Sequence, residues 1–550
     1  MRPRLFVLGL LFLAGVNLFG QQLNLNTPDS IFYNGKIVTV DSGFSIQQAF
    51  AVRGDQFIAV GTTAKIKAMA GKSTRLVDLK GSTVIPGLSD NHDHLYNAGK
   101  YLRGGVDLVG VTTLPEMLSR IKQGVAAAKP GETVFTTTGW AVRPGPTRKD
   151  LDQISMDVPI VVIGSRRGTG MLNGAALKLA GITGDTTSYL GSPVKKDAAG
   201  EPSGVIPDYP ASVQLIDKLL PPLTDAVEDE IIRKGEEERS ALGITSIREL
   251  QAWPPAVRAY YRLWRQNKLT LRLAMGIEFP DQAGTARELA LLGVGSAFGD
   301  HWMRLDAVGE EPWPPAFPTK PYTEIVTAMD ELGWRPTPHV SADGDRSTSD
   351  DATEAVLSAY EAADRVSPIK GKRWVVEHVP FATPAQLDRM EKLGLVISIQ
   401  YAGYLNGQQA IETMGKDRAE HQNPVREYLD HRLVVIGGSD YSGPKPDEAL
   451  PNNPLIPYYF YVTRKARTGE IVGGDEKISR AEALRIFTTN SAYATFEEKA
   501  KGSIQPGMLA DFVVLNQDLL TVPDDKILAT HPLATYVGGN KVFSAPSSNF

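Results

Sequence analysis

The stretch VIPGLSDNHDH (residues 84–94) decides the fold of this chain, because it joins a short apolar strand to two closely spaced histidines. His92 and His94 are two residues apart, and on an extended strand such residues point to the same face of the sheet. Both imidazoles can therefore bind one metal ion. With eight histidines in the chain, an H-x-H pair arises by chance roughly one time in ten, so it needs support from other residues.

Three further polar residues lie at the ends of apolar, β-rich segments later in the chain. His339 lies in RPTPHV, His378 ends RWVVEH, and Asp440 ends LVVIGGSD. Active-site residues of a (β/α)8 barrel lie at the C-terminal ends of its strands. A single histidine at a strand end is more often structural, which stays the alternative for His378 taken alone. Four imidazoles and a carboxylate together favour a metal site, most simply zinc, with one or two ions per subunit.

Eight strand-like segments, most of them separated by helical patterns, predict an α/β fold of the TIM (β/α)8 barrel type. The predicted strands are 83–90, 244–250, 271–277, 302–309, 335–341, 373–379, 395–400 and 433–440. The metal residues then follow strands 1, 5, 6 and 8. Residues 101–240 form a long insertion after strand 1, which we expect to be a lid or substrate subdomain.

Both ends of the chain are rich in short strands and turns. We expect residues 21–82 and 501–550 to pair into one small β-sandwich module outside a barrel spanning residues 83–500. Two unrelated hairpins are the alternative.

Before this module, Arg2 and Arg4 precede an apolar run and a plausible cleavage point at Gly20-Gln21. Residues 1–20 therefore predict a cleaved signal peptide and a secreted or periplasmic protein, with a membrane anchor as the alternative.

Composition narrows the function classes. The chain has 550 residues, a net charge of -5 and no cysteine. The charge gives no sign of a nucleic-acid partner, and no later segment predicts stable membrane insertion. The absence of cysteine excludes disulfides, thiolate metal ligands and a cysteine nucleophile. A small-molecule substrate is the expected partner, and a homo-oligomer is compatible with the sequence.

The chain resembles the amidohydrolase superfamily in several motifs spread over nearly its whole length. It is most similar to amidohydrolase family 3, the branch that includes N-substituted formamide deformylases. The motifs are VIPGLSDNHDH, EH at 377–378, GGSDY at 437–441, SRAEALRIFTTNSA at 479–492 and KGSIQPGMLADFVVL at 501–515. The resemblance implies that His92 and His94 bind the more buried metal. It implies that His339 and His378 bind a second metal or contact the substrate oxygen, and that Asp440 shuttles a proton.

The chain departs from the family pattern at two places. Many relatives carry a carboxylated lysine on strand 4 that bridges two metals, but this strand reads RLDAVGEE. Glu310 is the tentative bridging replacement and Glu311 the fallback; a single-metal site is the equal alternative. Similar sequences often have a histidine where Gly168 stands, which weakens any transfer of a relative's substrate.

The predicted metal ligands and the proton shuttle Asp440 together predict a metal-dependent hydrolase. Metal-activated water would cleave a non-peptide C–N bond, in an amide, formamide or cyclic amide. Ester, lactone or carbamate hydrolysis by the same site is the first alternative, and a non-catalytic secreted binding protein is the second. No G-x-S-x-G motif points to a serine nucleophile. For substrate contacts we consider Arg248, expected at the barrel mouth with Glu249, together with Trp313 and Tyr441. A structural ion pair or a helix cap is the alternative for Arg248 and Glu249.

Overall fold

The computed structural model describes residues 27–102, 105–137, 139–164, 170–189, 192–206, 215–216, 218–278, 282–310, 319–340, 346–443, 452–546, 548 and 550. The predicted signal peptide, Gly168, Glu311 and Trp313 lie outside these residues. Among the described residues, no helix has the length and apolar character needed to span a membrane.

The centre of the molecule is a set of parallel strands. One sheet has the order β16-β15-β14-β8 and the other the order β17-β18-β19. The strands are β8 (Leu88–Asp93), β14 (Ile244–Ala252), β15 (Arg272–Ile277), β16 (Met303–Val308), β17 (Val375–Glu377), β18 (Val396–Ile399) and β19 (Val434–Gly437). Their residues are buried almost throughout, as expected of parallel strands covered on both faces, although β8 and β14 also carry several polar residues.

Parallel bridges join the two central sheets at both edges. At one edge, residues 335–340 bridge to both sheets, through Val308 with Pro336 and through His339 with Glu377. At the other edge, Asp93 bridges to Tyr441, and the Asp440 amide donates to the His92 carbonyl at 2.7 Å. The central part is therefore a TIM-barrel-like α/β structure. The predicted strand at 335–341 forms only isolated bridges, because Pro336 and Pro338 lack the N–H groups that a continuous ladder needs.

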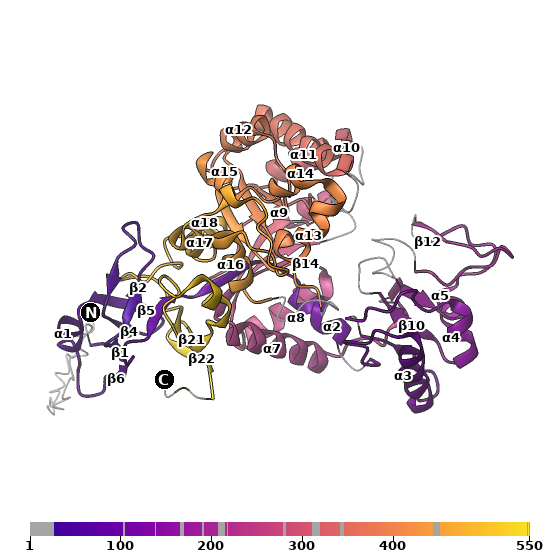
Figure 1. Ribbon diagram of the computed structural model, residues 1–550, viewed down its shortest axis with the longest axis horizontal. Coiled ribbons are helices and arrows are strands. Elements are labelled where there is room, and N and C mark those ends of the chain that lie inside the picture. Colours follow the sequence, from indigo (N-terminus) through magenta and orange to yellow (C-terminus); the bar gives the residue numbers. More distant parts are fainter. Residues whose placement is uncertain are drawn as a thin grey trace, which may run out of the picture.

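Helices cover the outside of the central strands (Figure 1). They are α2 (Leu95–Leu102), α7 (Asp225–Ala241), α8 (Pro254–Arg265), α9 (Gln282–Leu291), α10 (Thr319–Glu331), α11 (Arg346–Val366), α12 (Pro384–Leu393), α13 (Ala402–Met414), α14 (Lys416–Glu420), α15 (Val425–Asp430), α16 (Leu455–Thr463), α17 (Arg480–Ile486) and α18 (Thr489–Ala494). Local signals set several of their ends. For example, Thr383 caps α12 in a capping box, and Gly394 ends it in the left-handed conformation.

The two ends of the chain meet in one sheet. Its order is β22-β21-β20-β7-β2-β3, and β20 pairs antiparallel with β7. The strands are β2 (Lys36–Val38), β3 (Ile46–Gln47), β7 (Thr83–Pro86), β20 (Phe512–Leu515), β21 (Pro532–Val537) and β22 (Asn540–Ser544), with η3 (Asp524–Ala529) between β20 and β21. The predicted strand 83–90 is thus wrong as one strand: β7 belongs to this sheet and β8 to the centre. Gly87 separates them, and a Cβ there would lie 2.1 Å from Thr245 Oγ1.

A second small sheet packs against the first. Its order is β5-β4-β1-β6, formed by β1 (Ser30–Tyr33), β4 (Ala49–Arg53), β5 (Gln56–Gly61) and β6 (Arg75–Asp78), with α1 (Thr63–Lys67) following β5. Phe32 and Phe50 from this sheet share an apolar cluster with Phe512 and Tyr536 from the other. The Phe32 and Phe512 rings meet edge to face at 4.9 Å.

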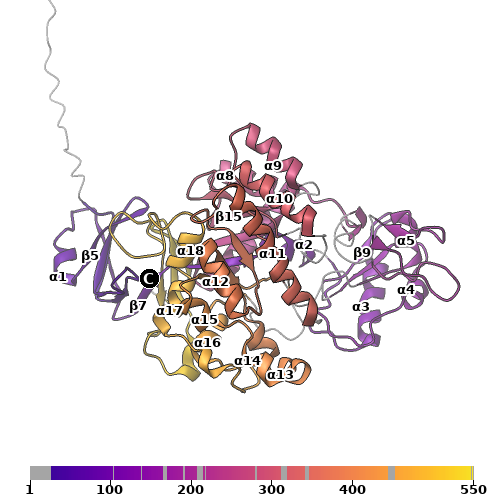
Figure 2. The same ribbon diagram turned by 90° about the horizontal axis from the view of Figure 1, so that it is seen from above.

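A separate lobe follows α2. It contains α3 (Leu114–Ala127), α4 (Arg148–Ile154), α5 (Gly174–Ala180), the sheet β11-β10-β9 and the hairpin β12-β13. These strands are β9 (Val134–Phe135), β10 (Ile160–Ile163), β11 (Gly170–Leu172), β12 (Ser188–Tyr189) and β13 (Ser192–Pro193). In both views the lobe lies at the opposite end of the molecule from the small sheets (Figures 1 and 2).

The predicted insertion of residues 101–240 is too long at its C-terminal end. Helix α7 falls within it, but Ile232 of α7 packs in the apolar cluster of the central part. Arg239 of α7 donates to both carboxylate oxygens of Asp93, at 2.7 and 2.8 Å. The lobe therefore ends before α7. The charge-rich sequence of α7 does not predict this packing. A buried charge is stable only when a partner compensates it, and the partner of Arg239 is Asp93, which is distant in sequence.

Candidate metal centre

The predicted ligands converge at the C-terminal ends of the central strands. His92 lies near the end of β8 and His94 directly follows this strand. Glu310 follows β16, His378 follows β17 and Asp440 follows β19. His92, His94 and Glu310 have no exposed surface, and His339 is buried at 8% exposure. The Asp440 side chain is 31% exposed, so it is the member of this set that solvent reaches most easily.

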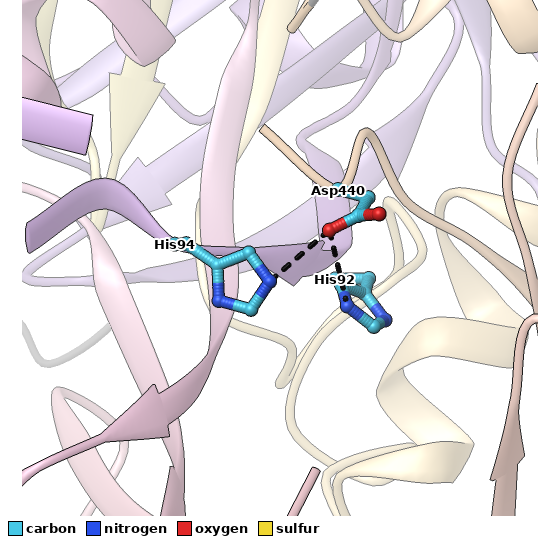
Figure 3. A group of neighbouring side chains, drawn as sticks. All are labelled: His92, His94 and Asp440. Carbon is cyan, nitrogen blue, oxygen red and sulfur yellow. Dashed lines mark hydrogen bonds and ion pairs between the residues drawn. The ribbon is translucent and has the colours of Figure 1, made fainter. Parts of the chain in front are cut away.

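Asp440 and the H-x-H pair form one compact donor group. Asp440 Oδ1 lies 3.1 Å from His94 Nε2 and 3.6 Å from His92 Nε2. Figure 3 shows both imidazoles directed at this one oxygen. Burial opposes ionisation of Asp440, but the hydrogen bond to His94 and the nearby His92 and His378 hold its pKa well below the ordinary value.

Glu310 lies at the centre of the four histidines. Its Oε1 is 3.4 Å from His92 Nε2 and 3.0 Å from His378 Nε2, and its Oε2 is 3.5 Å from His94 Nε2. His339 contacts Oε1 through Nδ1. His92, Glu310 and His378 make a second group of donors suited to a metal ion. The residue that the sequence proposed in place of the bridging lysine is therefore in contact with every predicted histidine ligand.

The donor set fits a metal ion. Zinc holds nitrogen and oxygen ligands at about 2.0–2.2 Å, so two donors on one ion lie within about 4 Å of each other. The donor pairs above are separated by 3.0–3.6 Å. Among the residues that the structure describes, His92 Nε2 has no hydrogen-bond partner, although it is buried and points into this group. An ion would satisfy this atom.

Three protein groups orient the imidazoles. His92 Nδ1 lies 2.8 Å from Glu377 Oε2, His94 Nδ1 lies 3.0 Å from the Leu250 carbonyl, and His378 Nδ1 contacts Gln400 Oε1. When Nδ1 donates to such an acceptor, the lone pair of a neutral imidazole is on Nε2. In all three residues Nε2 is the nitrogen that faces the donor group. The sequence reasoning missed Gln400, and treated Glu377 only as part of a motif.

The backbone is unusual at two of these positions. His378 has φ 71° and Asp440 has φ 51°, both in the left-handed region that side chains other than glycine rarely adopt. Such a conformation costs on the order of 1–3 kcal/mol and persists where the surrounding structure enforces it. Here it turns each side chain toward the donor group directly after its strand ends.

Asp90 is a further residue that sequence reasoning missed. Its Oδ1 accepts from the His92 amide at 3.1 Å and from the Ser439 amide at 2.9 Å. It therefore ties β8 to the segment that carries Asp440. Burial, with the nearby Asp93, raises the pKa of Asp90 to about 7. Asp90 is two residues before His92, so the strand periodicity that joined His92 to His94 also places Asp90 on that face.

Arg248 and Glu249 lie in the interior and not at the predicted barrel mouth, and they form the ion pair and the helix cap that the sequence offered as the alternative. Both are within β14, each with 1% exposure. Glu249 accepts from the amides of Leu95 and Tyr96 at 2.9 and 3.2 Å, so it caps the start of α2. Arg248 points between the strands and pairs with Asp306 and Glu377. The strand continues two residues past the predicted end, to Ala252, and both charges have buried partners.

Comparison with known proteins agrees with this geometry. The amidohydrolase family model matches residues 75–543. The chain belongs to the amidohydrolase family. Its members are metal-dependent hydrolases, and this protein is a metal-dependent amidohydrolase.

Several relatives of this amidohydrolase match over nearly their full length. An N-substituted formamide deformylase from Arthrobacter pascens is 26% identical, with 93% of this chain and 97% of that protein covered. The protein LONG AFTER FAR-RED 3 from Arabidopsis thaliana is 25% identical, with 94% and 91% covered.

Solved structures share the fold of this amidohydrolase. A metal-dependent hydrolase from Pyrococcus horikoshii has a TM-score of 0.71 at 21% identity, covering 90% of this chain and 99% of that chain. The atrazine chlorohydrolase of Arthrobacter aurescens, solved with zinc, has a TM-score of 0.54 at 14% identity, covering 94% and 95%.

A glycine beside the donor group offers a steric test of this amidohydrolase site. A Cβ at Gly438 would lie 2.4 Å from the His92 amide nitrogen and 2.5 Å from its Cβ. We expect Gly438→Ala to displace β8 from the Asp440 segment and to lower the free energy of unfolding by at least about 1–3 kcal/mol. Denaturant unfolding and zinc content measure the effect. Gly43→Ala is the matched control, since within the described part of the chain a Cβ there meets only Asp41 Oδ1, at 3.7 Å. Equal unfolding curves for both variants would contradict the close packing.

Proposed function

We propose that this amidohydrolase uses zinc to hydrolyse a non-peptide C–N bond of a small molecule, in an amide, formamide or cyclic amide. The observation that carries the proposal is the contact of His92 and His94 with a partly exposed Asp440, beside the second donor group of His92, Glu310 and His378. The similarity to a formamide deformylase supports this reaction class over others. We also propose that the bridges at both edges close the central strands into an eight-stranded barrel, and that the two small sheets form a β-sandwich.

The donor groups suggest how the ions are held. His92, His94 and Asp440 would hold one zinc ion, and His378 with Glu310 would hold a second, with His339 beside it. Glu310 would bridge the two because its two oxygens contact different histidines. A single-ion site remains the alternative, in which Glu310 orients the histidines by hydrogen bonds.

The chemistry divides between the metal and the chain. Bound zinc supplies a Lewis acid that polarises the substrate carbonyl and lowers the pKa of water to about 7. Asp440 accepts a proton from the attacking water as the new C–O bond forms. The same carboxyl then donates this proton to the leaving nitrogen as the C–N bond breaks, so the products are an acid and an amine. The partial exposure of Asp440 suits this exchange, because its carboxylate can reach both water and substrate.

The substrate contacts and the location of the protein stay proposals. Tyr441 is next to Asp440 and 8% exposed, and it would form part of the substrate wall. Trp313, which lies outside the described residues, stays a predicted substrate contact. We propose that cleavage after Gly20 releases a secreted or periplasmic enzyme; N-terminal sequencing of the protein purified from its host would show Gln21 first, and an intact residue 1 would reject this.

A substrate panel tests the reaction class. The zinc-loaded protein is assayed against formamides, N-acyl amino acids, cyclic amides, carbamates and lactones. We expect turnover of at least one amide class and its loss on chelation. Turnover confined to esters or lactones would reject C–N hydrolysis and leave the metal site intact. The Asp440→Asn protein is the matched blank, because it separates turnover at this site from that of contaminating enzymes.

A further inference from the structure

A group of buried charges lies directly behind the donor group without being part of it. Arg248 is on β14, Asp306 on β16, Arg335 on the bridging segment and Glu377 on β17, each with at most 2% exposure. The two arginines balance the two carboxylates. Unpaired charges cannot remain in such an interior, so the four side chains hold one another in place. The group joins three central strands and the bridging segment at the level of the metal site.

Arg248 is the hub of this group. Its Nε donates to Asp306 Oδ2 at 2.6 Å, its Nη2 donates to Thr337 Oγ1 at 2.7 Å, and its Nη1 donates to Glu377 Oε1. A guanidinium only donates hydrogen bonds, so the Thr337 hydroxyl accepts from Arg248. Its own proton is then directed at Glu377 Oε1, which it contacts. Arg248 thus holds Oε1 of Glu377 by two routes, one direct and one through Thr337.

The other oxygen of Glu377 reaches a predicted metal ligand. Oε2 lies 2.8 Å from Nδ1 of His92. A carboxylate beside a guanidinium is ionised and only accepts, so Nδ1 of His92 carries the proton. The lone pair of His92 is then on Nε2, which lies 3.4 Å from Glu310 and 3.6 Å from Asp440. The orientation and the tautomer of His92 therefore depend on how Glu377 is held.

We propose that Arg248 is a positioning residue: through Thr337 and Glu377 it fixes the ring of His92 with Nε2 as the metal-binding nitrogen. This inference rests on the metal site of the proposed function. It differs from the substrate contact predicted for Arg248, because Arg248 acts through His92 from the interior and touches no substrate. Loss of Arg248 would free Glu377 to turn, and His92 could then rotate or bind its proton on Nε2.

Arg272 provides a matched control. It is as buried as Arg248, with 1% exposure, and it donates to both oxygens of Asp511 at 2.6 and 2.8 Å. Asp511 also accepts from the Gly538 amide, so this pair ties the first residue of β15 to the small sheet. None of these partners is a predicted metal ligand. Arg272→Met thus reports the general cost of losing a buried arginine.

The experiment compares Arg248→Met, Thr337→Val and Arg272→Met by two measurements. The first is the apparent Kd for zinc, obtained by chelator competition. Removing partners of ligand side chains typically weakens metal binding by about 10- to 100-fold, and we expect this for Arg248→Met. We expect a smaller loss for Thr337→Val, and a change of less than about threefold for Arg272→Met. The second is the imidazole 15N spectrum of the metal-free protein, with the His92 signals assigned by their loss in His92→Gln. It is recorded at a pH high enough for His92 to be neutral, because Glu310 and Glu377, against the effect of burial, hold the pKa of His92 well above its ordinary value.

The two measurements separate positioning from folding. In wild type and Arg272→Met, we expect the proton of His92 on Nδ1; in Arg248→Met, we expect a mixture of tautomers or averaged signals. An unchanged zinc Kd in Arg248→Met, or an equal loss in Arg272→Met, would overturn the inference. If Arg248→Met does not fold, Thr337→Val decides, and a wild-type zinc Kd and His92 spectrum in that variant reject the proposal. If wild type binds no zinc, the proposed function fails, and the His92 spectra alone decide whether Arg248 positions this ring.

Discussion

Asp440→Asn is expected to retain the fold and most of the bound metal while kcat falls by about 10²- to 10⁴-fold, the usual contribution of a positioned acid–base group. The amide preserves the shape of the side chain, and its oxygen can still face His94 and His92, which lie 3.1 and 3.6 Å from Oδ1. It cannot accept the proton of water at neutral pH. The loss should therefore appear in turnover rather than in zinc content.

The measurement pairs kcat on a substrate from the panel with zinc content and the denaturation midpoint of the same sample. Asp518→Asn is the control, because Asp518 is also a partly exposed aspartate in an ion pair, with Lys36, but belongs to the small-sheet part of the molecule. It should keep wild-type kcat. If Asp440→Asn retains more than about a tenth of wild-type kcat, Asp440 is not the proton shuttle.

Glu310→Gln is expected to cause the second large effect, on metal content. We expect wild type to carry about one to two equivalents of divalent metal, most of it zinc, when it is grown with added metal. Glu310 contacts His92, His94, His339 and His378, so the substitution removes the one negative charge that all four histidines share. In a two-ion site the content should fall toward one equivalent, with a loss of activity; in a single-ion site the content should stay at one.

Elemental analysis and zinc titration measure this change. Glu236→Gln is the matched control, since Glu236 is also a buried glutamate, with 3% exposure, and burial raises its pKa to about 7. It accepts from the amides of Thr270 and Leu271 and contacts no predicted ligand. A Glu310→Gln protein with two equivalents of tightly bound zinc would rule out a bridging role. Wild-type protein with less than about 0.2 equivalents after reconstitution would reject the metal site itself.

Sequence reasoning was most effective for side chains at the ends of apolar runs. The H-x-H pair, His339, His378 and Asp440 were selected because each follows a strand-like segment, and the structure brings them together with Glu310. It placed Arg248 at the barrel mouth, with a structural ion pair as the alternative, and the structure shows the ion pair in the interior. Here Asp306 and Glu377, distant in sequence, compensate its charge inside the fold. Such pairing depends on which strands become neighbours, and no local pattern contains that information.

The boundaries and the burial of the elements show the same difference between local sequence patterns and tertiary contacts. The apolar run around Pro86 is continuous in sequence, but the chain passes from the small sheet to the central strands at Gly87. Thr245 lies so close to Gly87 that a side chain would not fit there. The charge run of α7 predicts a solvated helix face, and Arg233 and Glu237 are indeed exposed. In the same helix, Arg239 and Glu236 are buried with partners on other elements. Periodicity and turn residues thus predicted the order of most central strands, while the division at Gly87 and the isolated bridges of residues 335–340 depend on the tertiary structure.

The sequence alone also determined which side chains could bind a metal, because residue type and position at a strand end are local properties. Only the tertiary structure decided which nitrogen of His92 faces the site and how Arg248, Thr337 and Glu377 hold it. The left-handed backbone at His378 and Asp440 was likewise decided by contacts between strands. The reason is physical: hydrogen-bond partners and compensating charges come from residues up to several hundred positions apart, and their free energies exist only once the strands are assembled.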